Sequence, residues 1–269
     1  MIFVHDKGRM ANNILQYGHV YAWGREHGRT TVSMRFCYKY PWFHICHTSY
    51  HNFPTYAFAK YAAKWGLISS VRFDSDGADY SHEEQMMLSR RMIWVGGWYA
   101  RWYDLFLKYK AEILALFAFD EKVEQKVAGI MNPGKALRLG VHVRRGDYAT
   151  FQSGRFLYTD EQYVGVIRQF CALHPGGKPQ VFVCGNDPQL NRAYFTEQLK
   201  DCEVVFPDGN PAEDLCVLSH CDYLIGAPST FSLVAAMYRD LPLYWIEDAA
   251  TELTDSSFRR FDELFRKIW

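Results

Sequence analysis

The second half of the chain alternates short apolar strands with helices, and this alternation restricts the possible folds more than any other feature of the sequence. Apolar runs typical of buried strands occur at 139–143, 181–184, 204–206, 223–225 and 243–246. A helical pattern follows each of the first four, and 256–268 is predicted to form a terminal amphipathic helix. Because helical crossovers join parallel strands, we predict a parallel, doubly wound α/β sheet in this half.

The first half shows a weaker form of the same pattern. Strand-like runs occur at 2–4, 30–34 and 93–103. Helical spacing of apolar residues follows the first of these runs and recurs over 105–117 and 121–130. The polar and acidic segment 74–84 is expected to be a loop. The aromatic segment 37–65 is expected to lie mostly in the core.

A strong break in the pattern falls at Asn132, Pro133 and Gly134. A chain of 269 residues is long enough for two domains of ordinary size. We therefore expect an amino-terminal domain over 1–133 and a carboxy-terminal domain over 134–269.

Composition limits the partners and the compartment. The chain has 30 basic and 30 acidic residues, so a broad nucleic-acid interface is not expected, although a local basic pocket is compatible with this balance. Its seven cysteines, without a Cys-x-x-Cys pair, favour free thiols in a reducing compartment. The chain begins with a strand pattern and has no long apolar run, so we expect a cytoplasmic protein. Peripheral association with the inner face of the membrane stays open.

One cluster of potential metal ligands occurs in the aromatic segment, at His44, Cys46, His47 and His51. Its spacing fits no tetrahedral template, so no metal is expected there. The same aromatic segment could instead stack on sugar rings, which would make the chain a carbohydrate-binding protein.

Charged residues gather where the first strand of the second half ends. Residues 139–143 run directly into Arg144, Arg145, Gly146 and Asp147. Open α/β sheets bind ligands at the carboxyl ends of their strands, and two guanidinium groups suit a diphosphate. Taken alone, an ordinary solvated basic turn explains this stretch equally well.

Two other predicted strand ends contribute polar residues to the same edge. Asn186 and Asp187 follow one strand, and Ser229, Thr230 and Ser232 follow another. Such loops converge in a parallel sheet, so we expect three kinds of group to meet at this edge. They are guanidinium groups, hydroxyls at a helix start, and a carboxylate that could accept from the N–H groups of a base. The sequence therefore predicts a nucleotide-diphosphate site. The loop at Gly8 matches neither the dinucleotide fingerprint nor a P-loop.

Four short motifs, in order, resemble those of the alpha-1,2-fucosyltransferases. His142 to Asp147 is similar to the signature His-x-Arg-Arg-Gly-Asp, which the core alpha-1,6- and protein O-fucosyltransferases carry in a related form. The other three motifs lie at 8–17, at 181–188, and at 213–221 together with 229–232. The resemblance covers the first thirty residues and most of 138–250, and it is loose over 35–130.

The resemblance implies a GT-B arrangement of two Rossmann-like domains with the active cleft between them. The amino-terminal domain would bind an oligosaccharide acceptor and the carboxy-terminal domain the donor, GDP-fucose. Transfer would proceed with inversion, to galactose O2, and without a metal or other cofactor. Ala11, Asn13 and Leu233-Val234 depart from the family pattern, and these departures leave the acceptor and the linkage open.

The resemblance also implies residue roles. Arg144 would bind the diphosphate, and His142 and Asp187 would lie near the guanine and ribose. The β-phosphate would be bound by Ser229, Thr230 and Phe231. Independently of the resemblance, the loop at Gly8 precedes a predicted helix, whose first N–H groups could bind an anion or a hydroxyl-rich ligand. Taken alone, an ordinary βα turn is the better explanation of this loop.

The chemistry of transfer suggests further roles and leaves several alternatives. A metal-free enzyme needs fixed cations at the leaving diphosphate, for which Arg144 is the first candidate and Arg145 the second. An internal salt bridge is an equally good explanation of Arg145. Asp147 is a candidate general base, but it could instead pair with the arginines while the leaving phosphate takes the proton. A different nucleotide-sugar donor and a catalytically silent nucleotide-sugar-binding module also stay open, and the oligomeric state is not predicted.

Overall fold

The computed structural model describes residues 1–5, 7–131, 134, 136–185 and 187–268, and the chain divides into two units, Met1–Asp120 and Glu121–Trp269. The boundary therefore precedes the expected junction, of which Asn132 and Pro133 lie outside the described residues. Helix α6 (Glu121–Ile130) belongs to the second unit because it packs on α9 (Pro211–Ser219), burying Val123 and Val127.

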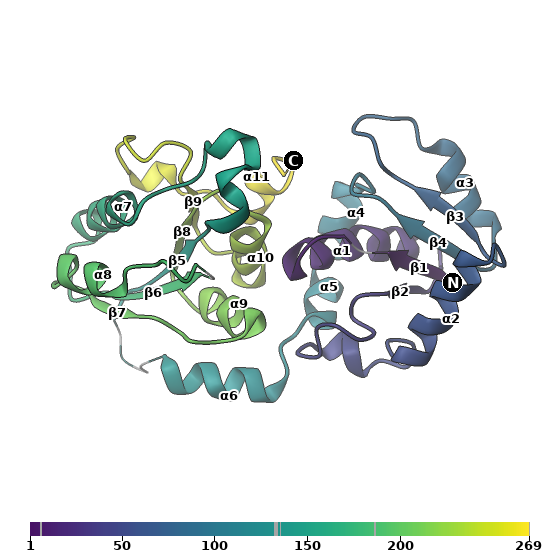
Figure 1. Cartoon of the computed structure of the whole chain (residues 1–269), viewed down its shortest axis with the longest axis horizontal. Coiled ribbons are helices and arrows are strands. Elements are labelled where there is room, and N and C mark those ends of the chain that lie inside the picture. The colour runs from purple at the N-terminus through teal and green to yellow at the C-terminus, as the bar shows by residue number, and fades with distance from the viewer. Residues whose placement is uncertain (6, 132–133, 135, 186, 269) are drawn as a thin grey trace. The chain divides into compact units, whose positions relative to one another are not determined.

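The second unit is built on the predicted parallel sheet (Figure 1). Its strands are β5 (Arg138–Val143), β6 (Gln180–Gly185), β7 (Glu203–Val205), β8 (Tyr223–Gly226) and β9 (Leu243–Trp245). They are ordered β7-β6-β5-β8-β9, and all pairs are parallel. His142 at the end of β5 is in register with Cys184 of β6 and Gly226 of β8, so these three strands end at one level.

Helices lie on both faces of this sheet. The remaining α-helices of the unit are α7 (Asp160–Leu173), α8 (Arg192–Gln198), α10 (Thr230–Arg239) and α11 (Phe261–Phe265). Figure 1 shows α7 and α8 on one side and α9 and α10 on the other. Leu139, Val141 and Val143 share a buried cluster with residues of α7. On the other face a Cβ at Gly140 would come within 2.8 Å of the Leu218 side chain of α9, so a larger residue there would force that side chain to move.

Two helix predictions in this unit are wrong. A helix was expected from Pro188, but α8 begins at Arg192, because Asp187 first accepts hydrogen bonds in a turn, including one from the Gln189 N–H at 3.0 Å. The terminal helix expected over 256–268 is helical only at α11, preceded by the short 3₁₀ turn η4 (Asp255–Ser257). Arg259 interrupts it by forming an antiparallel bridge with Leu243.

The first unit has a smaller parallel sheet, ordered β2-β1-β4-β3. Its strands are β1 (Ile2–His5), β2 (Thr31–Ser33), β3 (Ser69–Arg72) and β4 (Ile93–Gly96). Its helices are α1 (Met10–Glu26), η1 (His44–His47, 3₁₀), α2 (Phe53–Lys64), α3 (Ser81–Ser89), α4 (Tyr103–Lys108) and α5 (Lys110–Leu116). Strand β3 was not predicted because it is a polar edge strand in which only Val71 is buried. The loop expected over 74–84 ends early, since α3 begins at Ser81.

The aromatic segment of the first unit is only partly core. Phe43 and Ile45 are fully buried, but several large side chains on and around α2 are exposed. The expectation that most of these aromatics are core residues therefore fails at α2, whose buried face is made of alanines. All seven cysteines are free thiols, as predicted. None of the described helices is both long and apolar enough to cross a membrane.

Candidate functional site

The two arginines at the end of β5 are about equally enclosed, with side chains 15% and 13% exposed, but they have different partners. Arg145 makes the larger set of contacts. Its Nη2 donates to Asp160 at 2.6 Å, its Nη1 to Asp187 at 3.1 Å and its Nε to the Tyr158 carbonyl at 2.9 Å. The three charged side chains are only 11–14% exposed. Arg145 therefore holds the strand-end loop to the start of α7 and to the loop after β6. Asp187 is committed to the same ion pair, and its predicted neighbour Asn186 lies outside the described residues.

Arg144 pairs instead with an exposed acid. Its Nη2 donates to the Asp147 carboxylate at 2.7 Å, and its guanidinium lies 5.2 Å from the ring centre of Tyr148. The side chain of Asp147 is 52% exposed. An ion pair with an exposed carboxylate is weak, so an incoming anion can compete for the Arg144 guanidinium.

His142 lies buried between β5 and the start of α10. Its Nδ1 is 3.2 Å from the Ser229 hydroxyl, and its ring stacks on Phe231 with the ring centres 4.8 Å apart. Burial, and then the charge of Arg144, lower the pKa of His142 to about 3. The imidazole is therefore neutral near pH 7. It holds Ser229 and Phe231 in place without contributing a positive charge.

The start of α10 offers backbone N–H groups to an anion. Ser229 caps the helix by accepting a hydrogen bond from the Ser232 N–H at 3.3 Å, and Trp245 Nε1 donates to the Ser232 hydroxyl at 3.0 Å. No acidic residue lies in the first turn, where Thr230 and Phe231 contribute N–H groups. The Tyr148 hydroxyl donates to the Pro228 carbonyl at 2.5 Å, which ties the Arg144 loop to this helix start.

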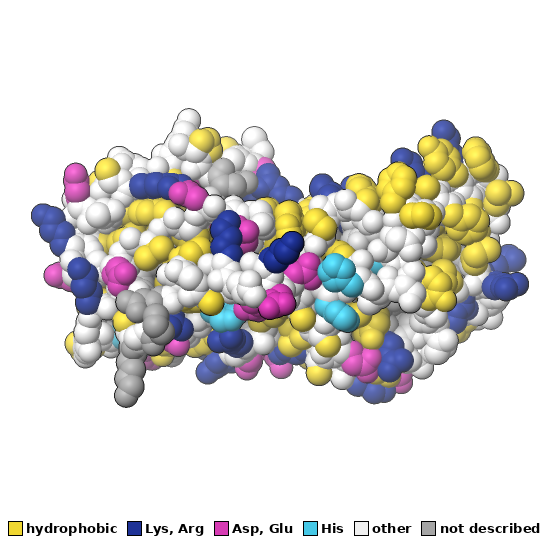
Figure 2. Space-filling view, turned by 90° about the horizontal axis from the view of Figure 1, so that it is seen from below, with side chains coloured by type: hydrophobic (Ala, Val, Ile, Leu, Met, Phe, Trp, Pro, Cys, Tyr) yellow, Lys and Arg dark blue, Asp and Glu magenta, His cyan; other side chains and the backbone are white. Residues whose placement is uncertain are grey.

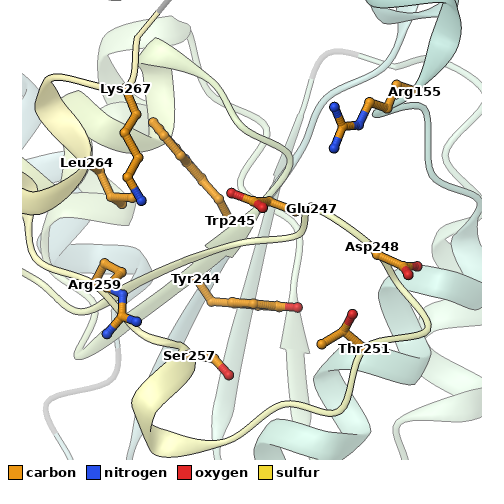
Figure 3. A pocket seen from close by; sticks show the side chains of 10 residues that line it. All are labelled: Arg155, Tyr244, Trp245, Glu247, Asp248, Thr251, Ser257, Arg259, Leu264 and Lys267. Atoms are coloured by element: carbon orange, nitrogen blue, oxygen red, sulfur yellow. The ribbon is translucent and has the colours of Figure 1, made fainter.

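Two hollows border these residues. One, of about 630 Å³, is lined by Arg145, Asp160 and Asp187 together with Tyr158 and Gln189. The other, of about 450 Å³, lies by the loop after β9 (Figure 3). Figure 3 shows Tyr244 and Trp245 at its centre, with Arg155 across from Lys267. Trp245 thus reaches from this second hollow to the cap of α10.

Asp214, in the first part of α9, is a further candidate residue that the sequence did not single out. Its Oδ1 is buried and has no hydrogen-bond partner within the described part of the chain. Burial, and then the charges of Glu213 and Asp208, raise the pKa of Asp214 to about 7. Its charge also acts on the thiol of Cys184, the β6 residue beside His142. Asp214 lies in the 213–221 motif, and this position was the signal available in the sequence. The sequence does not show, however, that its carboxyl oxygen is buried.

The other residues that the sequence singled out lie partly in the second unit and partly in the first. Leu233 and Val234 are fully buried in α10 and pack in the core. In the first unit Gly8 has a positive φ of 78°, and a Cβ there would lie 2.5 Å from Asn12 Nδ2. Helix α1 then starts at Met10 without a side-chain cap. Gly8 therefore belongs to an exposed helix start in a different unit from the arginines.

Residues 109–269 match the family model described as glycosyl transferase family 11. No curated protein gives a significant match. Several solved structures have a similar fold, at low sequence identity. A mutant of Arabidopsis thaliana FUT1 in complex with GDP is 15% identical, with a TM-score of 0.62 over 96% of this chain and 73% of that one.

Two further structures cover nearly the whole of both chains. NodZ alpha-1,6-fucosyltransferase soaked with GDP-fucose is 13% identical, with a TM-score of 0.56 over 96% of this chain and 98% of that one. POFUT1 in complex with GDP-fucose is 12% identical, with a TM-score of 0.60 over 89% and 94%. These matches confirm the α/β fold of two Rossmann-like domains that the motifs predicted.

Proposed function

The chain belongs to glycosyl transferase family 11, and on this premise we propose that it transfers fucose from GDP-fucose to a hydroxyl of an oligosaccharide, with galactose O2 as the expected acceptor atom. Solved structures of similar fold contain GDP or GDP-fucose, which supports this donor. The observation that carries the proposal is the position of Arg144, tied through Tyr148 to the start of α10 at the carboxyl edge of a parallel sheet.

In the proposed reaction the acceptor hydroxyl oxygen forms a bond to fucose C1, while the C1–O bond to the β-phosphate breaks and its electron pair goes to the phosphate. The Arg144 guanidinium and the N–H groups of Thr230 and Phe231 would stabilise that charge. The neutral ring of His142 would keep Ser229 and Phe231 in place. No metal is required in this scheme, because the fixed donors supply the stabilisation.

Asp147 has a positioning role in this proposal. Its contact with Arg144 at 2.7 Å makes it the ion-pair partner of the guanidinium. A carboxylate in that pair is a weak base for an acceptor hydroxyl. We therefore assign the acceptor proton to the departing phosphate, which gains negative charge as the C1–O bond breaks.

Asp214 is the proposed contact for the guanine base. Guanine presents an N1–H and an amino group side by side, and these two donors suit a carboxylate. The buried Oδ1 of Asp214 lacks a partner among the described residues, whereas Asp147, Asp160 and Asp187 are paired with arginines. Exchanging Asp214 for Asn should therefore weaken the preference for GDP over UDP and ADP.

A thermal-shift panel of nucleotides followed by a transfer assay tests the proposal. GDP should raise the melting temperature by roughly 5 °C at a hundredfold excess over its Kd, whereas UDP and ADP should not. GDP-fucose with a galactoside acceptor should then yield GDP and a fucosylated product, whose linkage NMR can assign.

Each other outcome of this panel points to a different function. Stabilisation by UDP instead of GDP would indicate another nucleotide-sugar donor. GDP binding without release of fucose, to an acceptor or to water, would leave a nucleotide-sugar-binding module.

A further inference from the structure

Three potential metal ligands meet between α6 and α9, away from the arginine site. Cys216 lies in the last part of α9, His220 is the residue directly after its end, and Glu124 faces them from α6. One ligand atom from each side chain lies within 4.8 Å of the other two. His220 lies just before β8, hence at the opposite edge of the sheet from the carboxyl ends that carry Arg144.

The contacts within this group leave one imidazole nitrogen directed at the carboxylate. His220 Nδ1 is 2.8 Å from the Cys216 carbonyl, and its Nε2 is 3.4 Å from Glu124. A histidine that donates from one nitrogen to a backbone carbonyl has the tautomer and orientation of a typical metal ligand. Cys216 is buried whereas the side chain of Glu124 is 44% exposed, so the group is open to solvent on one side.

We propose that Glu124, Cys216 and His220 bind a zinc ion that joins α6 to α9. A thiolate, an imidazole and a carboxylate are all zinc ligands, and water would complete a tetrahedral shell on the open side. The Cys216 thiol loses its proton to solvent on binding. The ion has a structural role here, because α6 is the helix that follows the unit boundary and packs on α9.

Metal titration of the purified, chelator-treated chain tests the site. Zinc, measured by competition with a chromophoric chelator, should bind at one ion per chain, and cobalt should give a thiolate charge-transfer band. Cys216→Ser and His220→Gln should each lower the zinc affinity by roughly 100-fold and abolish the cobalt band. Glu124→Gln, an exposed and milder change, should weaken binding in a chain that stays folded by circular dichroism.

The matched control is Cys171→Ser, which removes a thiol from the other close pair, Cys171 and Cys202, whose Sγ atoms are 3.3 Å apart. This variant should keep full zinc affinity. The site would be disproved by the absence of one-to-one binding, by binding that survives Cys216→Ser, or by binding that is lost in Cys171→Ser. The GDP thermal shift should not change in any folded variant, so this test is independent of the proposed transfer.

A second, independent inference concerns the surface of the first unit. Residues 27–73 contain no Asp or Glu, although acidic and basic residues balance in the whole chain. Six basic residues lie in this stretch: Arg29, Arg35, Lys39, Lys60, Lys64 and Arg72. Figure 2 shows a broad group of exposed hydrophobic side chains on this unit, with basic side chains among and beside them.

Helix α2 presents the apolar part of that surface. Phe58, Tyr61 and Trp65 follow one another at helical spacing and are 53%, 46% and 68% exposed, and Leu67 is 72% exposed. Ala59 and Ala62, which alternate with these residues along the helix, are buried in a cluster with Phe3 and Val32 of the sheet. The helix thus has an alanine face toward the core and an aromatic face toward solvent.

We infer that this face of α2 binds the surface of an anionic lipid bilayer. Aromatic rings favour the headgroup region, and Lys60 and Lys64 beside them would meet lipid phosphates. A glycan is the weaker candidate, because sugar hydroxyls are commonly bound by carboxylates and this stretch has none. The chain would then lie on a membrane directly through α2.

Sedimentation with lipid vesicles tests this inference. The chain should sediment with vesicles that contain phosphatidylglycerol and much less with phosphatidylcholine alone, and salt should weaken the binding. The double variants Trp65→Ser/Leu67→Ser and Lys60→Glu/Lys64→Glu should each lower the bound fraction about tenfold. Leu88→Ser on α3, where Leu88 is 47% exposed, is the matched control and should bind normally.

Three outcomes would overturn the membrane assignment. They are the absence of vesicle binding, equal binding by the α2 variants and the control, and a dimer in solution that both α2 variants disrupt. Retention of the GDP thermal shift in these variants would separate a failure of this inference from a failure of the proposed transfer.

Discussion

The starts of α10 and α1 are the same local structure in different surroundings, since each follows a parallel strand and points backbone N–H groups at the loop. At α10 the Ser229 cap contacts His142, and the preceding Pro228 carbonyl accepts from Tyr148. At α1 the cap position is Arg9, which makes no side-chain cap, and the glycine before it has a positive φ. The start of α10 is thus fixed by several hydrogen bonds, whereas the start of α1 is exposed.

The two units also differ in whether a buried polar side chain has hydrogen-bond partners, as Arg145 and Asn13 show. In the second unit Arg145 uses three of its N–H groups on two acids and a carbonyl. In the first unit Asn13 is fully buried on α1, and neither polar atom of its side chain has a partner among the described residues. Within the described part of the chain, the fold therefore supplies partners for the polar groups of Arg145 but not for those of Asn13. Substitutions in the two places should therefore act in opposite directions.

The largest effect is expected at Arg145. Arg145→Met should lower the free energy of unfolding by about 3–5 kcal/mol, because it leaves Asp160 and Asp187 charged and nearly buried without a cation. Urea denaturation measures the change. Adding Asp160→Asn and Asp187→Asn to the same chain should recover part of the loss. Unchanged stability in the single variant would show that the three side chains do not form this network in solution.

Arg144 should affect turnover without affecting stability. Arg144→Lys keeps a positive charge but loses the planar fork, so kcat/KM for transfer should fall roughly 100- to 1000-fold. The melting temperature should stay within about 1 °C of the wild type, since the Asp147 partner is exposed. Turnover close to that of the wild type would remove Arg144 from its assigned role.

Asp214 should make stability depend on pH. Its pKa in the folded chain, about 7, lies above its ordinary value near 4, so the folded chain holds a proton that the unfolded chain releases. The resulting stabilisation is complete below about pH 4 and is lost as the pH rises through 7.

Relative to Asp214→Asn, the wild type should therefore lose about 2 kcal/mol between pH 4 and pH 8, less than the full linkage value because water screens part of the burial. Urea titrations of both chains at several pH values measure the difference. A difference that stays constant with pH would contradict the burial of this carboxyl.

The smallest effect, of opposite sign, is expected in the first unit. Asn13→Leu should raise the free energy of unfolding by about 1 kcal/mol, because it replaces an unpartnered buried amide with an apolar side chain of similar branching. Gln16 on the same helix is the matched control, since it accepts from the Lys7 N–H at 2.8 Å and donates to the Gly97 carbonyl. Gln16→Leu should destabilise the chain by about 1–2 kcal/mol. If Asn13→Leu destabilised it as much, Asn13 would have a partner in solution.

Most of the second unit could be predicted from its sequence, because a strand buried on both faces is nearly all apolar and the following helix has a different period. The five strands and the capping box of α7 at Thr159 are local patterns of this kind. The first unit was harder to predict. Its edge strand β3 is polar, and the aromatic residues of α2 do not reveal which of them are buried.

The sequence predicted which loops form the candidate site, but it did not predict which partner each arginine has. Parallel strands bring the loops after β5, β6 and β8 to one edge, and this follows from the order of elements. Which arginine forms the internal ion pairs does not follow from it, because Arg144 and Arg145 are adjacent and identical. The ion pair between Asp160 and Arg145 was not predicted either, because the two residues are fifteen positions apart in the sequence.

The sequence by itself determined a doubly wound α/β half, with its arginines at a strand end and hydroxyls at a helix start, because periodicity and capping depend on near neighbours. Only the tertiary structure decided that Arg145 is enclosed by Asp160 and Asp187 while Arg144 pairs with an exposed acid. It also decided that Asp214 Oδ1 and both side-chain polar atoms of Asn13 are buried without a partner among the described residues. The physical reason is that burial and ion pairing depend on segments that are distant in sequence and meet only in the folded chain.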